Sequence, residues 1–190
     1  MQTNLEKLIV FLQNTYGVEV VIKDSIEDGI EIAELVNRTI LINKQSRSET
    51  EILFVIGHLF GHMVQFSHYE DYRHLVEKVG EPKPLQLSND FKKAFYAYEV
   101  EGYRIGKGLM ETVLGKTETN ILDEKYQIYL ETDFITFWEY LTTGNQISVS
   151  AFNTLLLRNY IDWKGRYPNQ LKGIPPPDTI VFSSVDVKVY

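Results

Sequence analysis

The sequence predicts an α+β fold that is mainly helical, with a small N-terminal antiparallel sheet and further C-terminal helices. Short β-branched runs separated by polar turns are confined to residues 18–42, and apolar residues at helical spacing dominate from there to about residue 160. The chain has 190 residues, of which 44% are hydrophobic, so it can bury one substantial core and does not need two. We therefore expect a single domain over residues 1–190.

The first predicted element is a helix that is capped by Thr3 or Asn4 and ends at Gly17. Its apolar residues recur at helical spacing: Leu5, Leu8, Ile9 and Leu12. Three β-branched runs follow at residues 18–22, 29–33 and 39–42. The acidic and polar turns between these runs predict the antiparallel sheet.

Helices follow the predicted sheet. Ser48 and Glu51 form a capping-box pattern before an apolar run through Phe66, so a helix begins near residue 49. The prolines and glycine of residues 78–90 predict a loop, and a second long helix should run from about residue 89 to 114, ending at Gly115. Two further helical stretches, near 132–142 and 149–159, flank a turn at residues 143–145.

Composition limits the chemistry and the partners. Because the chain has no cysteine, any metal ion must be held by imidazole and carboxylate groups. A net charge of −7 makes nucleic acid an unlikely partner. No stretch is long and apolar enough for a membrane helix, and the N-terminus has no signal-peptide pattern. We expect a cytoplasmic protein with no membrane association.

The helix that begins near residue 49 carries His58 and His62, four positions apart. One turn separates them, so both imidazoles can reach one metal ion at about 2.0–2.1 Å, as on the two-histidine helix of zinc peptidases. The alternative is a pair of histidines that make ordinary hydrogen bonds. The helix is apolar almost all round, and Gly57 and Gly61 within it each cost about 1 kcal/mol relative to alanine. A metal site, or the close approach of another segment, would account for these glycines.

His68 is one candidate for the third ligand. It follows His62 by six residues, which is the histidine spacing of metzincins. Gln65, however, occupies the position where that motif has a glycine for its sharp turn. Residues 67–71 are more typical of a solvated helix end, so His68 is the weaker candidate.

Glu101 is the stronger candidate. It lies on an apolar stripe of the next long helix, where a carboxylate needs a compensating cation such as a metal ion. Glu99 lies about 160° away around the same helix and is less favoured. The sequence therefore predicts a metal site made of His58, His62 and Glu101. The alternative is that Glu101 pairs with Arg104 or accepts hydrogen bonds from tyrosine hydroxyls.

With these residues in view, the sequence resembles the ImmA/IrrE family of zinc-peptidase-like proteins, which are similar to gluzincins, over roughly residues 5–115. The corresponding parts are an N-terminal helix, a strand-and-hairpin region ending at residues 38–43, the two-histidine helix and the segment 99–104. In the family this segment reads like E-x-E-A-x-x-F-A followed by L-L-M, and here Leu109 and Met110 follow. The resemblance implies a zincin-like domain with a zinc cofactor, and it puts Glu101 at the third ligand position.

The resemblance also divides the expected domain. Residues 1–115 correspond to the metal-site core, and residues 116–160 are similar in outline to the helix-turn-helix-like segment that often follows it; two ordinary packed helices are the alternative. The tail, residues 161–190, contains three consecutive prolines after Ile174 and cannot be helical there. Val185, Val187 and Val189 alternate with polar residues, which predicts a strand.

Leu59 decides the expected function. In working members of the family this position holds the glutamate of HExxH, which takes a proton from metal-bound water, and leucine has no proton-accepting group. We expect a metal-binding protein that is not a conventional peptidase and that engages an unknown protein or peptide partner. The alternatives are a metal-dependent hydrolase whose base comes from another element and a metal-free, transcription-associated regulator, so enzymatic activity stays open.

Overall fold

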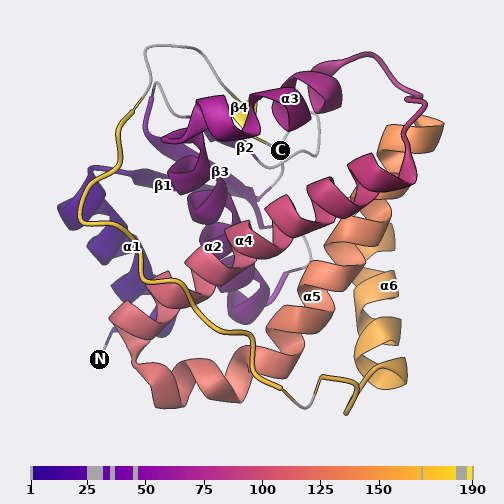
Figure 1. The fold of residues 1–190 in the computed structure, drawn as a ribbon. Coiled ribbons are helices and arrows are strands. Elements are labelled where there is room, and N and C mark those ends of the chain that lie inside the picture. The colour runs from indigo at the N-terminus through magenta and orange to yellow at the C-terminus, as the bar shows by residue number, and fades with distance from the viewer. Residues whose placement is uncertain are drawn as a thin grey trace.

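A computed structural model describes residues 2–24, 32–34, 37–44, 47–167, 169–182 and 188–189. The elements are α1 (Asn4–Tyr16), β1 (Glu19–Lys23), β2 (Ile32–Glu34), β3 (Thr39–Asn43), α2 (Glu49–Phe66), α3 (Tyr69–Gly80), α4 (Asn89–Leu114), α5 (Lys116–Thr143), α6 (Val149–Asp162) and β4 (Lys188–Val189). Helices make up most of the chain, which confirms the mainly helical α+β class (Figure 1). Within the described residues, no helix is both long enough and apolar enough to span a membrane.

The sheet is mixed, with strand order β1-β3-β2-β4. β2 pairs antiparallel with β3 and with β4, but β1 pairs parallel with β3 in a register that places Val21 opposite Leu41. The predicted antiparallel sheet was therefore wrong for one pair, because β3 lies between β1 and β2 instead of on the outside of a meander. In the tail, the predicted strand is present at Val189, whereas Val185 and Val187 lie outside the described residues.

The caps predicted from sequence close the first two long helices. Thr3 and Glu6 form a capping box at α1, and Gly17 ends that helix with a φ of 65°. Ser48 and Glu51 form the expected capping box at α2. Every residue of α2 from Ile52 to Phe66 is buried, because α1, α4 and the sheet surround it. A helix with no solvated face must find partners for its polar side chains inside the protein.

α2 and α4 cross where each helix has two glycines one turn apart, and the two helices lie next to each other along this crossing (Figure 1). A β-carbon on Gly61 would lie 2.0 Å from the carbonyl oxygen of Gly102, and one on Gly57 would lie 3.4 Å from Gly106 Cα. At Gly61 only glycine permits this approach; at the other pair it is Gly106 of α4 that must lack a β-carbon, because one there would lie 2.4 Å from the Gly57 carbonyl oxygen. The close approach of α4 is thus one reason for Gly61, whereas a β-carbon on Gly57 would need only small shifts.

α5 departs most from the predicted elements, since it begins at Lys116 and not near residue 132. Gly115, with a φ of 89°, separates it from α4. The first half of α5 buries the polar residues Thr119 and Asp123 beside Tyr126, so its apolar periodicity is weak. The predicted loop is shorter than expected, because α3 continues to Gly80 before it.

The tail returns across the helices to the sheet, as the segment from orange to yellow in Figure 1 shows. The backbone N–H of Ile174 donates to Arg104 of α4 at 2.9 Å, and Tyr16 of α1 donates to the carbonyl of Pro177 at 2.7 Å. Asp123 accepts from the buried Lys107 at 2.6 Å and from the backbone of Leu171 at 3.0 Å. The prolines keep the segment out of helical conformation, as expected, and these bonds hold it against α1, α4 and α5.

Candidate metal centre

The two histidines of α2 face a carboxylate of α4. His58 Nε2 lies 3.0 Å from Glu99 Oε2, and His62 Nε2 lies 3.3 Å from the same oxygen. One ligand atom from each residue lies within 4.8 Å of the other two, and all three residues are buried. The structure therefore brings together a group, His58, His62 and Glu99, that can hold a metal ion.

Glu99, and not the predicted Glu101, lies beside the two histidines. α4 faces α2 through its glycines, and Glu99 lies three positions before Gly102, on the same face. Glu101 lies toward α3, where its carboxylate accepts from the hydroxyl of Tyr72 and, at 2.9 Å, from Gln65 Nε2. The apolar stripe of α4 did not mark the face toward α2, because the close contact is made by glycines, which carry no hydrophobic signal.

The two other histidines lie away from this group. His68 is exposed immediately before α3, and His74 is exposed within α3. The structure thus excludes the metzincin-like arrangement in which His68 would return to the metal ion. It also decides between the alternatives for Glu101: the partner is a tyrosine hydroxyl, and Arg104 Nε donates to the backbone of Lys172 instead.

A glutamine fixes the orientation of the His62 ring. Gln65 Nε2 donates to the Tyr98 carbonyl and to the Glu101 carboxylate, both at 2.9 Å. Both partners are acceptors, so the Gln65 atom that faces them must be the amide nitrogen. The amide oxygen of Gln65 must therefore face His62 Nδ1, which lies 2.7 Å away. His62 Nδ1 then carries the proton, and a neutral ring presents the lone pair of Nε2 to Glu99.

An aspartate of α5 lies beside His58, and we did not predict it. Asp133 Oδ2 lies 3.3 Å from His58 Nδ1 and accepts from the Tyr103 hydroxyl at 2.8 Å. A His58 ring with its proton on Nδ1, toward Asp133, would present Nε2 to Glu99 in the same way as His62. The sequence did contain a signal: Asp133 lies at helical spacing with the buried residues Tyr126, Tyr129 and Leu130.

Burial and nearby charge act in opposite directions on these groups. Burial disfavours the ionised form of Glu99, but the two histidines outweigh it and hold the pKa of Glu99 at about 2. Burial also disfavours the charged form of His62, yet the charge and hydrogen bond of Glu99 raise its pKa above the usual value. Burial raises the pKa of Asp133, with His58 opposing and Glu99 adding to the shift. The centre thus needs positive charge beside Glu99.

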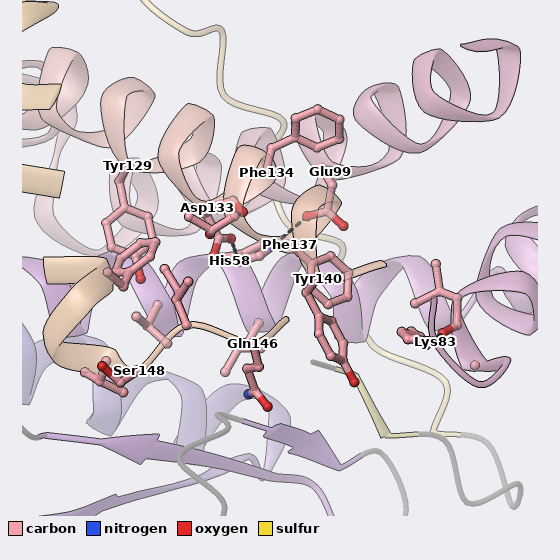
Figure 2. A pocket seen from close by; sticks show the side chains of 18 of the residues that line it. His58, Lys83, Glu99, Tyr129, Asp133, Phe134, Phe137, Tyr140, Gln146 and Ser148 are labelled. Carbon is pink, nitrogen blue, oxygen red and sulfur yellow. Dashed lines mark hydrogen bonds and ion pairs between the residues drawn. The ribbon is translucent and has the colours of Figure 1, made fainter. Parts of the chain in front are cut away.

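A cavity of about 480 Å³ lies against one side of the centre. His58, Glu99 and Asp133 line it, and dashed lines in Figure 2 join His58 to both carboxylates. Leu59, which has no proton-accepting group, also lines this cavity. His62 is enclosed behind this wall, with 1% of its surface exposed. Aromatic side chains form much of the remainder: Tyr129, Phe134, Phe137, Tyr140 and Phe152.

No protein-family model, curated protein or solved structure matches this chain. The resemblance to the ImmA/IrrE family therefore stays a prediction.

Proposed function

We propose that the chain is a metal-binding, zincin-like protein in which His58, His62 and Glu99 hold a zinc ion, and that it is not a conventional peptidase. One observation carries this proposal: the Nε2 atoms of His58 and His62 face a single carboxylate oxygen of Glu99, while Nδ1 of His62 is hydrogen-bonded to Gln65 and Nδ1 of His58 lies 3.3 Å from Asp133. Neutral imidazoles that carry their protons on Nδ1 would place three lone pairs against one another. A cation between these three atoms removes that repulsion.

The spacing of the donors fits a metal ion. Ligands at roughly 2.0–2.1 Å from a tetrahedral zinc ion are about 3.3–3.4 Å apart. The distances from Glu99 Oε2 to the Nε2 atoms of His58 and His62, 3.0 and 3.3 Å, are close to that value. A zinc ion supplies the positive charge beside Glu99 without requiring two charged imidazoles in a buried site.

The donor set favours zinc over the commoner hard cations. Two imidazole nitrogens and one carboxylate oxygen match zinc sites with three protein ligands, whereas magnesium and calcium prefer oxygen ligands. His58 and Glu99 line the cavity, so the side of the site without a protein ligand faces open space. That arrangement is typical of zinc sites with an open position rather than of closed structural sites.

Leu59 argues against ordinary peptide hydrolysis. A bound zinc ion would act as a Lewis acid and activate water, but a nearby group must still accept the proton. Leu59, 2% exposed, occupies the position of that group and offers only methyl groups. Asp133 is the acid that lines the cavity 3.3 Å from His58, and it already accepts from the Tyr103 hydroxyl. The cavity is therefore suited to binding a ligand beside the metal more than to cleaving it.

Asp133 supports a second candidate, a metal-dependent hydrolase with a relocated base. Its side chain is 29% exposed and lines the cavity, so one carboxylate oxygen has access to water there. Hydrolysis of peptide or ester substrates that Asp133→Asn abolishes, with metal content unchanged, would favour this candidate. Activity that appears only in Leu59→Glu would instead support a protein that has lost an ancestral base.

Metal analysis of protein purified without a histidine tag tests the main proposal. We expect about one zinc ion per chain in the native protein and almost none in His58→Ala, His62→Ala or Glu99→Ala. His68→Ala and His74→Ala are matched controls, since both histidines are exposed and lie outside the group. If the native chain binds no zinc, or if the controls lose it equally, the proposal fails, and the metal-free regulator becomes the better hypothesis.

A further inference from the structure

Two tyrosines of α4 lie against the two histidines of α2. The Tyr103 ring stacks on His58 with centroids 4.1 Å apart and an interplanar angle of 24°, and the Tyr98 ring stacks on His62 at 4.9 Å and 22°. Tyr103 lies four positions after Glu99, so both side chains extend from the same face of α4. The helix that supplies the proposed carboxylate ligand thus also covers one face of each imidazole.

Tyr103 reaches His58 by a second route, through its hydroxyl. This hydroxyl donates to Asp133 Oδ2 at 2.8 Å, and the same oxygen lies 3.3 Å from His58 Nδ1. The Asp133 side chain is 29% exposed and lines the cavity, so without this hydrogen bond its carboxylate is free to turn toward water there. The Tyr103 hydroxyl therefore holds the carboxylate next to His58.

The His62 side is built in a comparable way. The Tyr98 carbonyl accepts from Gln65 Nε2 at 2.9 Å, and the amide oxygen of Gln65 lies 2.7 Å from His62 Nδ1. On both sides, a tyrosine of α4 covers the ring face and also bonds to the group beside Nδ1. At Tyr98 the bond is made by a backbone carbonyl, which any residue supplies, whereas at Tyr103 it is made by the side chain. Of the two tyrosines, only Tyr103 can lose this bond by substitution.

Core packing alone does not account for the Tyr103 hydroxyl. Tyr103 and Tyr126 are each 1% exposed, and their ring centroids lie 5.1 Å apart. The Tyr126 hydroxyl has no hydrogen-bond partner within the part of the chain that the structure describes, whereas the Tyr103 hydroxyl is bonded to a carboxylate beside a histidine. The two tyrosines are thus equally buried and differ in what their hydroxyl groups contact.

We propose that Tyr103 is a positioning residue of the metal centre. Its ring holds the plane of the His58 imidazole, and its hydroxyl holds Asp133 beside Nδ1. Together these contacts keep Nε2 of His58 directed at the Glu99 carboxylate. This inference rests on the proposed zinc function. Groups that orient metal ligands commonly change metal affinity by about 10- to 100-fold, and a hydroxyl that acts one bond further out should change it by less, about fivefold.

Removal of one buried hydroxyl at a time tests this role. Tyr103→Phe and Tyr126→Phe each delete a hydroxyl and keep the ring, and competition with a chromophoric chelator gives the zinc affinity of both variants. We expect Tyr103→Phe to weaken zinc binding by about fivefold and Tyr126→Phe to leave it unchanged. Native affinity in Tyr103→Phe, or an equal loss in the two variants, would overturn the proposal.

A double-mutant cycle tests the route through Asp133. Asp133→Ala should weaken zinc binding by about tenfold. Because Tyr103 acts through Asp133, the addition of Tyr103→Phe to this variant should cause no further loss. Independent effects would multiply to about fiftyfold, and that result would contradict the route.

Tyr103→Leu, which also removes the ring, tests the stacking on His58. The absorption spectrum of cobalt-loaded protein reports the geometry of the ligands. We expect Tyr103→Leu to change this spectrum and to bind zinc more weakly than Tyr103→Phe does. Phe60→Leu is the matched control: Phe60 is fully buried on α2, points away from both histidines and contacts Tyr16 at 5.1 Å.

Both leucine variants should be less stable in urea, but only Tyr103→Leu should alter the cobalt spectrum. Equal spectral changes in the two would contradict a positioning role for the ring. Tyr103→Phe, which keeps the packing, decides the proposal if Tyr103→Leu does not fold. Native protein that binds zinc no better than Tyr103→Phe refutes only this inference, whereas native protein that binds no zinc refutes the proposed function as well.

Discussion

The two histidines of α2 share a helix and a facing carboxylate oxygen, but their surroundings differ. At the His62 level, the ring stacks on Tyr98 with centroids 4.9 Å apart, and its Nδ1 is held by a buried glutamine. Gly61 lies against Gly102 so closely that no side chain fits between the helices. This level is sealed from solvent and from the cavity.

The His58 level is more open. The ring stacks on Tyr103 with centroids 4.1 Å apart, and its Nδ1 lies 3.3 Å from Asp133, whose side chain reaches the cavity. Gly57 lies opposite Gly106, but an added β-carbon there would first meet the Tyr126 hydroxyl at 3.3 Å. One side of the centre is thus built for rigidity and the other for access. The two histidines of one helix thus differ in access to the cavity because different side chains surround them.

Substitution of Gly61 and of Gly57 should give the largest difference between the His62 and His58 levels, measured as the free energy of unfolding. Gly61→Ala should lower the free energy of unfolding by about 3 kcal/mol or more, because its β-carbon would meet backbone atoms that cannot move aside. Gly57→Ala should cost about 1 kcal/mol or less, since its nearest contacts, at 3.3–3.5 Å, need only small shifts. Urea denaturation of both variants measures this.

Gly80→Ala is the matched control for the glycine pair. Gly80 ends α3, and nothing lies within 4 Å of an added β-carbon, so stability should change by less than about 1 kcal/mol. If Gly57→Ala is as damaging as Gly61→Ala, the two levels are equally tight and the contrast is wrong.

The next largest effect should be on zinc affinity, and it should differ between Gln65, which lies beside Nδ1 of His62, and Asp133, which lies beside Nδ1 of His58. Gln65→Ala should weaken zinc binding by about 100-fold, and Asp133→Ala by about tenfold, within the usual range for groups that orient metal ligands. Water from the cavity can replace the Asp133 carboxylate, whereas no water has access to the sealed side of His62. Competition with a chromophoric chelator gives both affinities. Glu139→Ala, an exposed acid of α5, should leave the affinity unchanged.

A larger loss in Asp133→Ala than in Gln65→Ala would reverse the comparison. It would show that charge beside His58 matters more than the sealed amide beside His62.

Substitution of Glu101 should change zinc affinity the least. Glu101→Gln keeps an oxygen that accepts from Gln65 and from Tyr72, so zinc affinity should change by less than about threefold. Glu99→Gln removes a charged ligand and should abolish stoichiometric binding. Metal analysis of this isosteric pair separates the two glutamates. Zinc loss in Glu101→Gln with retention in Glu99→Gln would restore the assignment predicted from sequence.

Parts of the fold could be predicted because their signals are local. The capping boxes, the glycine stop after α1 and the apolar run of α2 are set by neighbours within a few residues. The parallel pairing of β1 with β3 could not be predicted, because it depends on where β3 inserts in the sheet. The start of α5 was missed because its first turns bury the polar residues Thr119, which donates to the Gly115 carbonyl, and Asp123, which accepts from Lys107 of α4.

The third ligand shows the same division. Periodicity correctly separated Glu99 from Glu101 around α4, but hydrophobicity chose the wrong face. A better signal was the matched spacing of glycines in the two helices, four positions apart in each, which marks faces where backbones meet.

The sequence by itself determined three things: a buried helix that carries His58 and His62 one turn apart, the absence of thiolate ligands, and a leucine, which accepts no proton, directly after His58. These are properties of residue identity and of spacing within one helix. The tertiary structure alone decided that Glu99 lies beside both histidines, that Gln65 orients the His62 ring, that Asp133 lies next to His58, and that a cavity borders His58 and not His62. The physical reason is that helix geometry fixes which residues share a face, whereas packing between helices fixes what that face meets.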